Sequence, residues 1–180
     1  MINMIKNEMN SQKKIIEKII ENLQNYIYTA SIITTETIKN GNKIFLFGNG
    51  SSSLTCQNIA LKMMLQNKKV LSLCSESAII TSIGNNYDFD RIFELQIKTL
   101  AQKGDLLIGI STSGNSKNVL RALSLGQNMG CKTIGFSGYD GGAMNEFSDI
   151  NLTVPSDNKD RIKEMHIMIG NIICQVTKGI

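Results

Sequence analysis

Two short segments rich in serine and glycine carry the residues of this sequence that are best suited to chemistry. The first is the run 48–53, Gly-Asn-Gly-Ser-Ser-Ser, and the second is the run 111–116, Ser-Thr-Ser-Gly-Asn-Ser. Serine and threonine hydroxyls donate hydrogen bonds without adding bulk, and glycine lets backbone N–H groups approach a ligand closely. This combination suits an anion, and in particular the phosphate monoester of a small molecule.

Short apolar runs indicate the elements that must position these loops. Five runs predict buried strands, at 43–47, 70–73, 106–110, 133–136 and 150–154. Helical stretches follow at about 52–66, 89–102, 116–129 and 160–177. Apolar strands that alternate with helices predict a parallel sheet covered on both faces, an α/β fold with three αβα layers. In such sheets ligands bind at the carboxyl ends of the strands, where both serine loops lie.

The serine loops also have a simpler interpretation, because clusters of Ser, Gly and Asn are typical of turns and helix N-caps. One such loop alone would favour that interpretation, whereas two loops at equivalent strand ends favour a binding site. Neither loop contains G-x-x-x-x-G-K-[ST] or G-x-G-x-x-G, so neither nucleotide-binding fingerprint applies.

The first forty residues carry a helical pattern and contain no glycine or proline. An apolar stripe at helical spacing runs through Ile15, Ile16, Ile19, Ile20 and Leu23. A second helical pattern follows over 27–38, so we predict an N-terminal helical hairpin. The apolar stripe of this hairpin must be buried against another surface, and we expect the hairpin to mediate oligomerisation. The chain is thus a single domain, 1–180, with a helical arm at 1–40 and the αβα core at 41–180.

Composition excludes several classes of protein. With 42% hydrophobic and 19% charged residues, the chain is typical of globular proteins. The net charge of +4 is mild and the basic residues are dispersed, so no direct nucleic acid binding is expected. No apolar run approaches the length of a membrane span, and no signal peptide is evident. The four cysteines lack C-x-x-C spacing and suit buried thiols in a reducing cytoplasmic environment.

Six motifs, in order along the chain, carry a resemblance to a known family. They are G-N-G-S-S-S at 48–53, I-G-N-N-Y at 83–87, G-I-S-T-S-G-N-S-K-N-V-L at 109–120, G-G-A-M-N at 141–145, V-P-S at 154–156 and R-I-K-E-M-H at 161–166. Together they resemble the phosphoheptose isomerase branch of the sugar isomerase (SIS) family. The resemblance implies a five-stranded parallel sheet, a homotetramer with sites at subunit interfaces, and conversion of sedoheptulose 7-phosphate to an aldoheptose 7-phosphate.

The resemblance also implies roles for individual residues. The phosphate would be held by Ser52, Ser111, Thr112, Ser113 and Ser116. The remainder of the sugar would lie near Asn49, Glu76, Asn85 and Lys163.

The sequence departs from the family pattern at the metal site. In that pattern one helix supplies a histidine and, four residues on, a glutamate, while the last helix supplies a glutamine and, eight residues on, a histidine. Here these positions read Asn58, Lys62, Lys163 and Asn171. A protonated ammonium cannot ligate zinc, and an amide is a poor substitute for imidazole. We therefore expect no zinc, no other cofactor and no catalytic residue of the family type, with Lys62 and Asn171 as degenerate positions.

The two lysines at this site have two interpretations. In the first, they are surface residues of a site that has lost its metal ligands. In the second, their ammonium groups replace the metal and bind a second acidic group of the ligand. A desolvated lysine with a lowered pKa could also serve as a base. The only histidine, His166, is expected to be a structural residue that makes a hydrogen bond.

Three functions remain open from the sequence. The first is binding of a sugar phosphate without the metal-dependent isomerase chemistry. The second is a sedoheptulose 7-phosphate isomerase, in a pathway to heptose precursors of lipopolysaccharide or capsule, with an altered, metal-free site. The third is a protein-binding scaffold of the type that associates with the DnaA initiator (DiaA type), which Asn171 and the loop 138–142 resemble. The expected partners are a sugar phosphate, further copies of the chain and, for the scaffold, another protein, with no membrane association.

Overall fold

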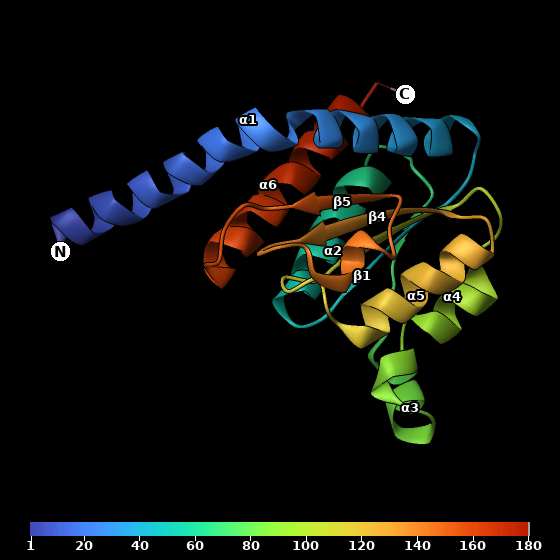
Figure 1. Ribbon diagram of the computed structural model, residues 1–180. Coiled ribbons are helices and arrows are strands. Elements are labelled where there is room, and N and C mark those ends of the chain that lie inside the picture. The colour runs from blue at the N-terminus through green and yellow to red at the C-terminus, as the bar shows by residue number, and fades with distance from the viewer. Residues whose placement is uncertain (180) are drawn as a thin grey trace.

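The computed structural model describes residues 1–179 and contains the predicted parallel sheet with helices on both faces (Figure 1). In chain order its elements are α1 Ile2–Lys39, β1 Ile44–Gly48, α2 Ser51–Met64, β2 Val70–Ser72, α3 Ser77–Asn86, the 3-10 helix η1 Phe89–Arg91, α4 Glu94–Leu100, β3 Leu106–Ile110, α5 Lys117–Asn128, β4 Lys132–Ser137, the 3-10 helix η2 Gly142–Asn145, β5 Ile150–Thr153 and α6 Lys159–Val176. The strand order is β2-β1-β3-β4-β5 and every pairing is parallel. The predicted five-stranded αβα fold is therefore confirmed.

Successive side chains of β1 point to opposite faces of the sheet, where they join two separate layers of the core. Ile44 and Leu46 belong to the apolar cluster that α1, α2 and α6 cover. Phe45 and Phe47 point to the other face and join the cluster beneath α4 and α5. All residues of β1 and β3 are buried, which explains why these strands read as continuous apolar runs.

The predicted strands match the observed ones to within one residue at each end. The helix expected over 89–102 is divided into η1 and α4, and α3 was not predicted. Because α3 buries none of its residues, its sequence carries no stripe fixed by packing.

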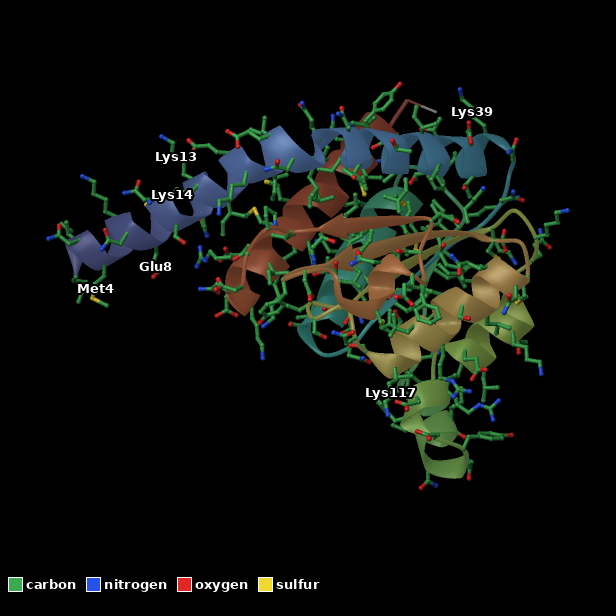
Figure 2. The ribbon with its side chains drawn as sticks, in the orientation of Figure 1. Met4, Glu8, Lys13, Lys14, Lys39 and Lys117 are labelled. Carbon is green, nitrogen blue, oxygen red and sulfur yellow. The ribbon has the colours of Figure 1, made fainter. Side chains whose placement is uncertain are left out.

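The prediction of an N-terminal hairpin is wrong, because α1 is one continuous helix of 38 residues. Without glycine or proline before Gly41, nothing in the sequence breaks the helix. Its buried residues begin at Ile15, and the part that carries Met4 and Glu8 extends beyond the sheet (Figure 2). Although α1 is long, neither it nor another helix of residues 1–179 has the length and apolar character to cross a membrane.

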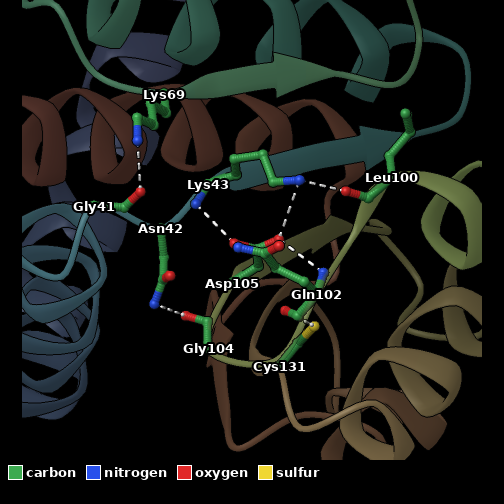
Figure 3. Close-up of polar contacts among 9 residues, drawn as sticks. All are labelled: Gly41, Asn42, Lys43, Lys69, Leu100, Gln102, Gly104, Asp105 and Cys131. Atoms are coloured by element: carbon green, nitrogen blue, oxygen red, sulfur yellow. Dashed lines mark hydrogen bonds and ion pairs between the residues drawn. The ribbon is translucent and has the colours of Figure 1, made fainter.

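The amino edge of the sheet, opposite the serine loops, is held by a buried carboxylate (Figure 3). Asp105 is fully buried and accepts hydrogen bonds from the backbone N–H groups of Lys43 (2.8 Å) and Gln102 (2.9 Å). The Lys43 ammonium lies 3.7 Å from the same carboxylate. These contacts join the starts of β1 and β3, so we assign Asp105 a structural role.

Candidate functional site

The two serine loops lie side by side, because β1 and β3 are neighbours and both loops leave the carboxyl edge of the sheet. They border a cavity of about 310 Å³. Its lining residues are Asn49, Gly50, Ser51, Ser52, Ile110, Ser111, Thr112, Ser113, Ser116, Tyr139 and Lys159. The structure thus brings together Asn49 and all five predicted phosphate-binding residues. The sequence analysis did not single out Tyr139 or Lys159.

A pair of amide side chains joins the two loops. Asn49 Nδ2 donates to Asn118 Oδ1 at 2.8 Å, and Asn118 Nδ2 donates back to Asn49 Oδ1 at 2.9 Å. Asn118 is buried and its Oδ1 also accepts from the backbone N–H of Val119. This reciprocal contact fixes the distance between the loops. Sequence reasoning missed Asn118, although it lies within the 109–120 motif.

The second serine loop is partly organised by its own hydroxyls. Ser111 is buried, and its Oγ lies 2.8 Å from Ser116 Oγ and accepts from the Ser116 N–H at 3.3 Å. Ser113 is exposed, and its Oγ accepts from the Asn115 N–H at 3.2 Å. Because each hydroxyl can still donate or accept elsewhere, the loop presents donors to the cavity while keeping its shape.

Two helices begin at the cavity without a side-chain cap. α2 starts after Gly50 and α5 after Ser116, and neither N-cap residue makes a side-chain cap hydrogen bond. Uncapped N–H groups and the positive end of each helix dipole favour an anion at these positions. The cavity therefore combines hydroxyls, amides and two helix N-termini, which is the chemistry that a phosphate group requires.

The segment 138–143 packs against the second serine loop and forms hydrogen bonds with it. Gly114 has φ +67°, and a Cβ there would lie 1.9 Å from the Gly141 carbonyl oxygen, so only glycine fits. Gly138 N donates to Thr112 O at 3.0 Å, and Ala143 N donates to Asn115 Oδ1 at 2.9 Å. These contacts hold the second serine loop in place, which gives a physical reason for the G-G-A-M-N motif at 141–145.

Three predicted site residues lie outside the cavity of the single chain. Glu76 is the N-cap residue of α3, and Asn85 lies near the end of the same helix; both are exposed. Figure 1 shows α3 projecting from the body of the domain. Lys163 forms an ion pair with Asp160 at 3.3 Å on α6. Their roles toward the sugar stay predictions.

The four positions of the family metal site do not fit zinc. Lys62 of α2 donates from its Nζ to Asn171 Oδ1 of α6, so an ammonium group occupies the contact between the two helices. Asn58 is exposed, one helical turn before Lys62, and Lys163 is paired with Asp160. Nowhere in residues 1–179 do three or more His, Cys, Asp or Glu side chains gather so that they could hold a metal ion.

His166 is a structural residue, as predicted. It is buried within α6, and its Nε2 donates to the Ser137 carbonyl oxygen at 2.9 Å. The ring packs edge-on against Phe136, and its Nδ1 has no partner among the described residues. Burial lowers the pKa of His166 from 6.5 to about 4, and the Ser137 contact opposes this shift only in part.

This shift predicts that acid destabilises the protein. The unfolded chain takes up a proton near pH 6.5, whereas folded His166 stays neutral until about pH 4. Stability is therefore complete above pH 6.5 and falls as the pH drops from 6.5 to 4, by about 3 kcal/mol for the full shift. Urea unfolding at pH 7, 6 and 5 measures this slope. Since His166 is the only histidine, His166→Gln should flatten the curve between pH 6.5 and 5, and a flat wild-type curve would contradict the assignment.

The four cysteines are free thiols, and one of them lies beside the first serine loop. Cys74 Sγ donates to the Gly48 carbonyl oxygen at 3.3 Å. A hydrogen bond from Cys56 lowers the pKa of Cys74 to about 7, although partial burial opposes the shift. Burial raises the pKa of the neighbouring Cys56 thiol.

Comparisons with known proteins agree with the fold. The family model described as "SIS domain" matches residues 9–138. A phosphoheptose isomerase of Aliarcobacter butzleri is 48% identical over 175 residues, covering 94% of this chain and 93% of the relative. A phosphoheptose isomerase of Nitratiruptor is 46% identical over 182 residues, covering 98% of this chain and 97% of the relative. The solved phosphoheptose isomerase of Neisseria gonorrhoeae superposes with a TM-score of 0.96 at 29% identity, covering 99% and 98%. The chain therefore belongs to the phosphoheptose isomerase family of SIS-domain proteins.

Proposed function

We propose that this protein binds a phosphorylated heptose in the cavity between its serine loops and acts as a phosphoheptose isomerase. The observation that carries the proposal is the convergence of hydroxyls, amides and two uncapped helix N-termini on one cavity at the carboxyl edge of the sheet. The shared name of the relatives at 48% and 46% identity supports both the substrate class and the reaction. The substrate would be sedoheptulose 7-phosphate and the product an aldoheptose 7-phosphate.

The reaction moves a proton between C1 and C2 of the sugar, so it needs a base that can titrate. The cavity lining holds no carboxylate and no imidazole. Because the family metal positions do not fit zinc, an isomerase built on this chain would work without the metal. A base would then be Lys159 or Tyr139 of the lining, or a residue outside the lining of the single chain.

A second candidate is binding of the sugar phosphate without turnover. The observation that favours it is the hydrogen bond between Lys62 and Asn171, which places an ammonium and an amide where the family pattern has a glutamate and a histidine. In this candidate the serine loops keep their role and only the proton transfer is lost. The third possibility, a protein-binding scaffold, stays a prediction of the sequence.

A binding assay combined with a turnover assay tests these candidates. Titration calorimetry with sedoheptulose 7-phosphate measures binding, and a coupled assay for aldoheptose 7-phosphate measures isomerisation, each with and without a chelator. Turnover that survives the chelator supports the metal-free isomerase, and binding without turnover supports the second candidate. If neither binding nor turnover is detected, the proposed function is wrong.

We also propose that the protein is a homotetramer, and that α1 contributes to its interfaces. Apolar side chains of α1 and α6 line a groove of about 400 Å³ on the surface of the single chain. Its residues include Ile16, Ile20, Tyr28, Ile172 and Val176. Burial of such a surface against another copy would remove apolar area from water. Light scattering should return four times the 19.9 kDa chain mass, and a monomer at micromolar concentration would contradict the proposal.

A further inference from the structure

One positively charged residue lines the cavity between the serine loops. Lys159, the first residue of α6, borders it together with Ser111, Ser113 and Ser116. No arginine, aspartate, glutamate or second lysine belongs to the lining. The other lining residues carry hydroxyls, one amide, no side chain or one apolar side chain, so Lys159 is the only charged residue among those that line the cavity.

This ammonium is not engaged elsewhere in the described chain. None of the ion pairs within residues 1–179 includes Lys159. The nearby Asp160 is paired with Lys163 at 3.3 Å, so the lysine predicted to contact the sugar already has a carboxylate partner. Lys159 therefore keeps its charge available for a ligand.

The N-terminus of α6 is capped by a side chain, unlike those of the other two helices at the cavity. Asn158 caps the helix, and its Oδ1 accepts from the N–H groups of Asp160 (2.9 Å) and Arg161 (3.3 Å). α2 and α5, in contrast, start at the cavity without side-chain caps. α2 and α5 thus start at the cavity with uncapped N-termini, which favour an anion, whereas α6 adds the positively charged residue Lys159 to the lining.

Hydrogen bonds hold the segment before Lys159 against the end of β4. Val154 N donates to Ser137 O at 2.9 Å, and Tyr139 N donates to Ser156 O at 3.0 Å. Asn158 N in turn donates to Ser156 Oγ at 3.1 Å. Tyr139, which lines the cavity beside Lys159, has φ +55°, a left-handed conformation that is uncommon for tyrosine. The backbone of Lys159 is therefore fixed relative to the serine loops.

We propose that Lys159 is a specificity-determining residue, whose ammonium pairs with the phosphate group of the bound sugar and selects phosphorylated over unphosphorylated ligands. The inference rests on the proposed function, because it concerns the same cavity. Hydroxyls and amides bind neutral sugars as well as phosphates, whereas an ammonium favours a dianion over a neutral hydroxyl group. The serine loops would supply shape and hydrogen bonds, and Lys159 would supply the charge.

Calorimetric titration of sedoheptulose 7-phosphate into wild type and Lys159→Gln tests this inference. We expect the substitution to weaken binding by roughly tenfold, the lower range for a hydrogen bond to a charged group. Lys159→Glu should weaken binding further, and Lys159→Arg should restore most of it. The affinity of wild type should also fall more steeply than that of Lys159→Gln when NaCl is raised from 50 to 300 mM. Lys39→Gln, at the far end of α1, is the matched control and should leave binding unchanged (Figure 2).

The outcomes separate this inference from the proposed function. Wild-type binding together with a loss specific to Lys159→Gln and Lys159→Glu supports both. Wild-type binding that is equal in Lys159→Gln overturns the role of Lys159 and leaves the cavity as the sugar-phosphate site. Absence of wild-type binding to sedoheptulose 7-phosphate overturns both. Melting curves of each variant confirm that it is folded.

Discussion

Purified wild-type protein is expected to contain no stoichiometric zinc, even after growth in zinc-rich medium. The contact between α2 and α6 carries the Lys62 ammonium, which donates to Asn171 Oδ1. A dication placed about 4 Å from this ammonium group would be repelled by roughly 8 kcal/mol at an effective dielectric of 20, before screening by salt. Neither Asn58 nor Asn171 offers a charge that compensates. Elemental analysis of the purified protein measures the zinc content directly.

Restoring the family residues should create the missing metal site. The quadruple variant combines Asn58→His, Lys62→Glu, Lys163→Gln and Asn171→His, so two imidazoles, one carboxylate and one amide replace two amides and two ammonium groups. The quadruple variant is expected to bind zinc, and the pair Lys62→Glu with Asn171→His should bind it more weakly because half of the family ligands are absent. Stoichiometric zinc in the wild type would overturn the interpretation, as would a folded quadruple variant that holds none.

The wild type and the quadruple variant can be compared further in the isomerase assay. Turnover that appears only after restoration would favour the binding-only candidate for the natural sequence. Equal turnover in both proteins, insensitive to a chelator, would favour the metal-free isomerase. Glu76 and Asn86 also differ from the aspartates that the family pattern implies, so we expect only partial activity in the restored variant.

The sheet could be predicted from the sequence because its strands are buried on both faces. Every residue of Ile44–Gly48 and Leu106–Ile110 is buried, so each strand stands out as an apolar run between polar loops. The continuity of α1 could not be predicted in the same way. Its two apolar patterns resemble two helices, although the segment lacks a glycine or proline to separate them, and the structure has one continuous helix whose buried residues run from Ile15 to Thr37.

The candidate site was predictable where it follows a strand and not where it depends on tertiary contacts. Ser111 and Ser116 follow β3 directly, and their place at the carboxyl edge is fixed by topology. Tyr139 follows β4 at the same edge, but its residue type does not indicate an anion site, whereas Lys159 reaches the cavity from the start of α6, which no local pattern indicates. Asn118 is similar, because its contact with Asn49 joins residues 69 positions apart.

Replacement of both Ser111 and Ser113 by alanine is expected to weaken sugar-phosphate binding by at least tenfold. Each change removes a hydroxyl from the wall of the cavity, and a hydrogen bond to a charged group contributes about 1.5–3 kcal/mol. Ser111→Ala should account for the larger share, because Ser111 is buried and its Oγ also contacts the hydroxyl and the N–H of Ser116. Ser113→Ala removes an exposed hydroxyl whose contact within the loop is longer, at 3.2 Å.

Calorimetry with sedoheptulose 7-phosphate on the two single variants and the double variant measures these effects. Thr99→Ala is the matched control, since it removes an exposed hydroxyl on α4 that bonds only within its own helix. The double variant should remain folded, because the loop also keeps its backbone hydrogen bonds from Gly138 N to Thr112 O and from Met144 N to Gly114 O. If its affinity equals that of the wild type, the segment 111–116 is only the turn between β3 and α5. A loss confined to Ser111→Ala would instead mean that Ser113 does not reach the phosphate, and that the buried hydroxyl pair of Ser111 and Ser116 makes the contact.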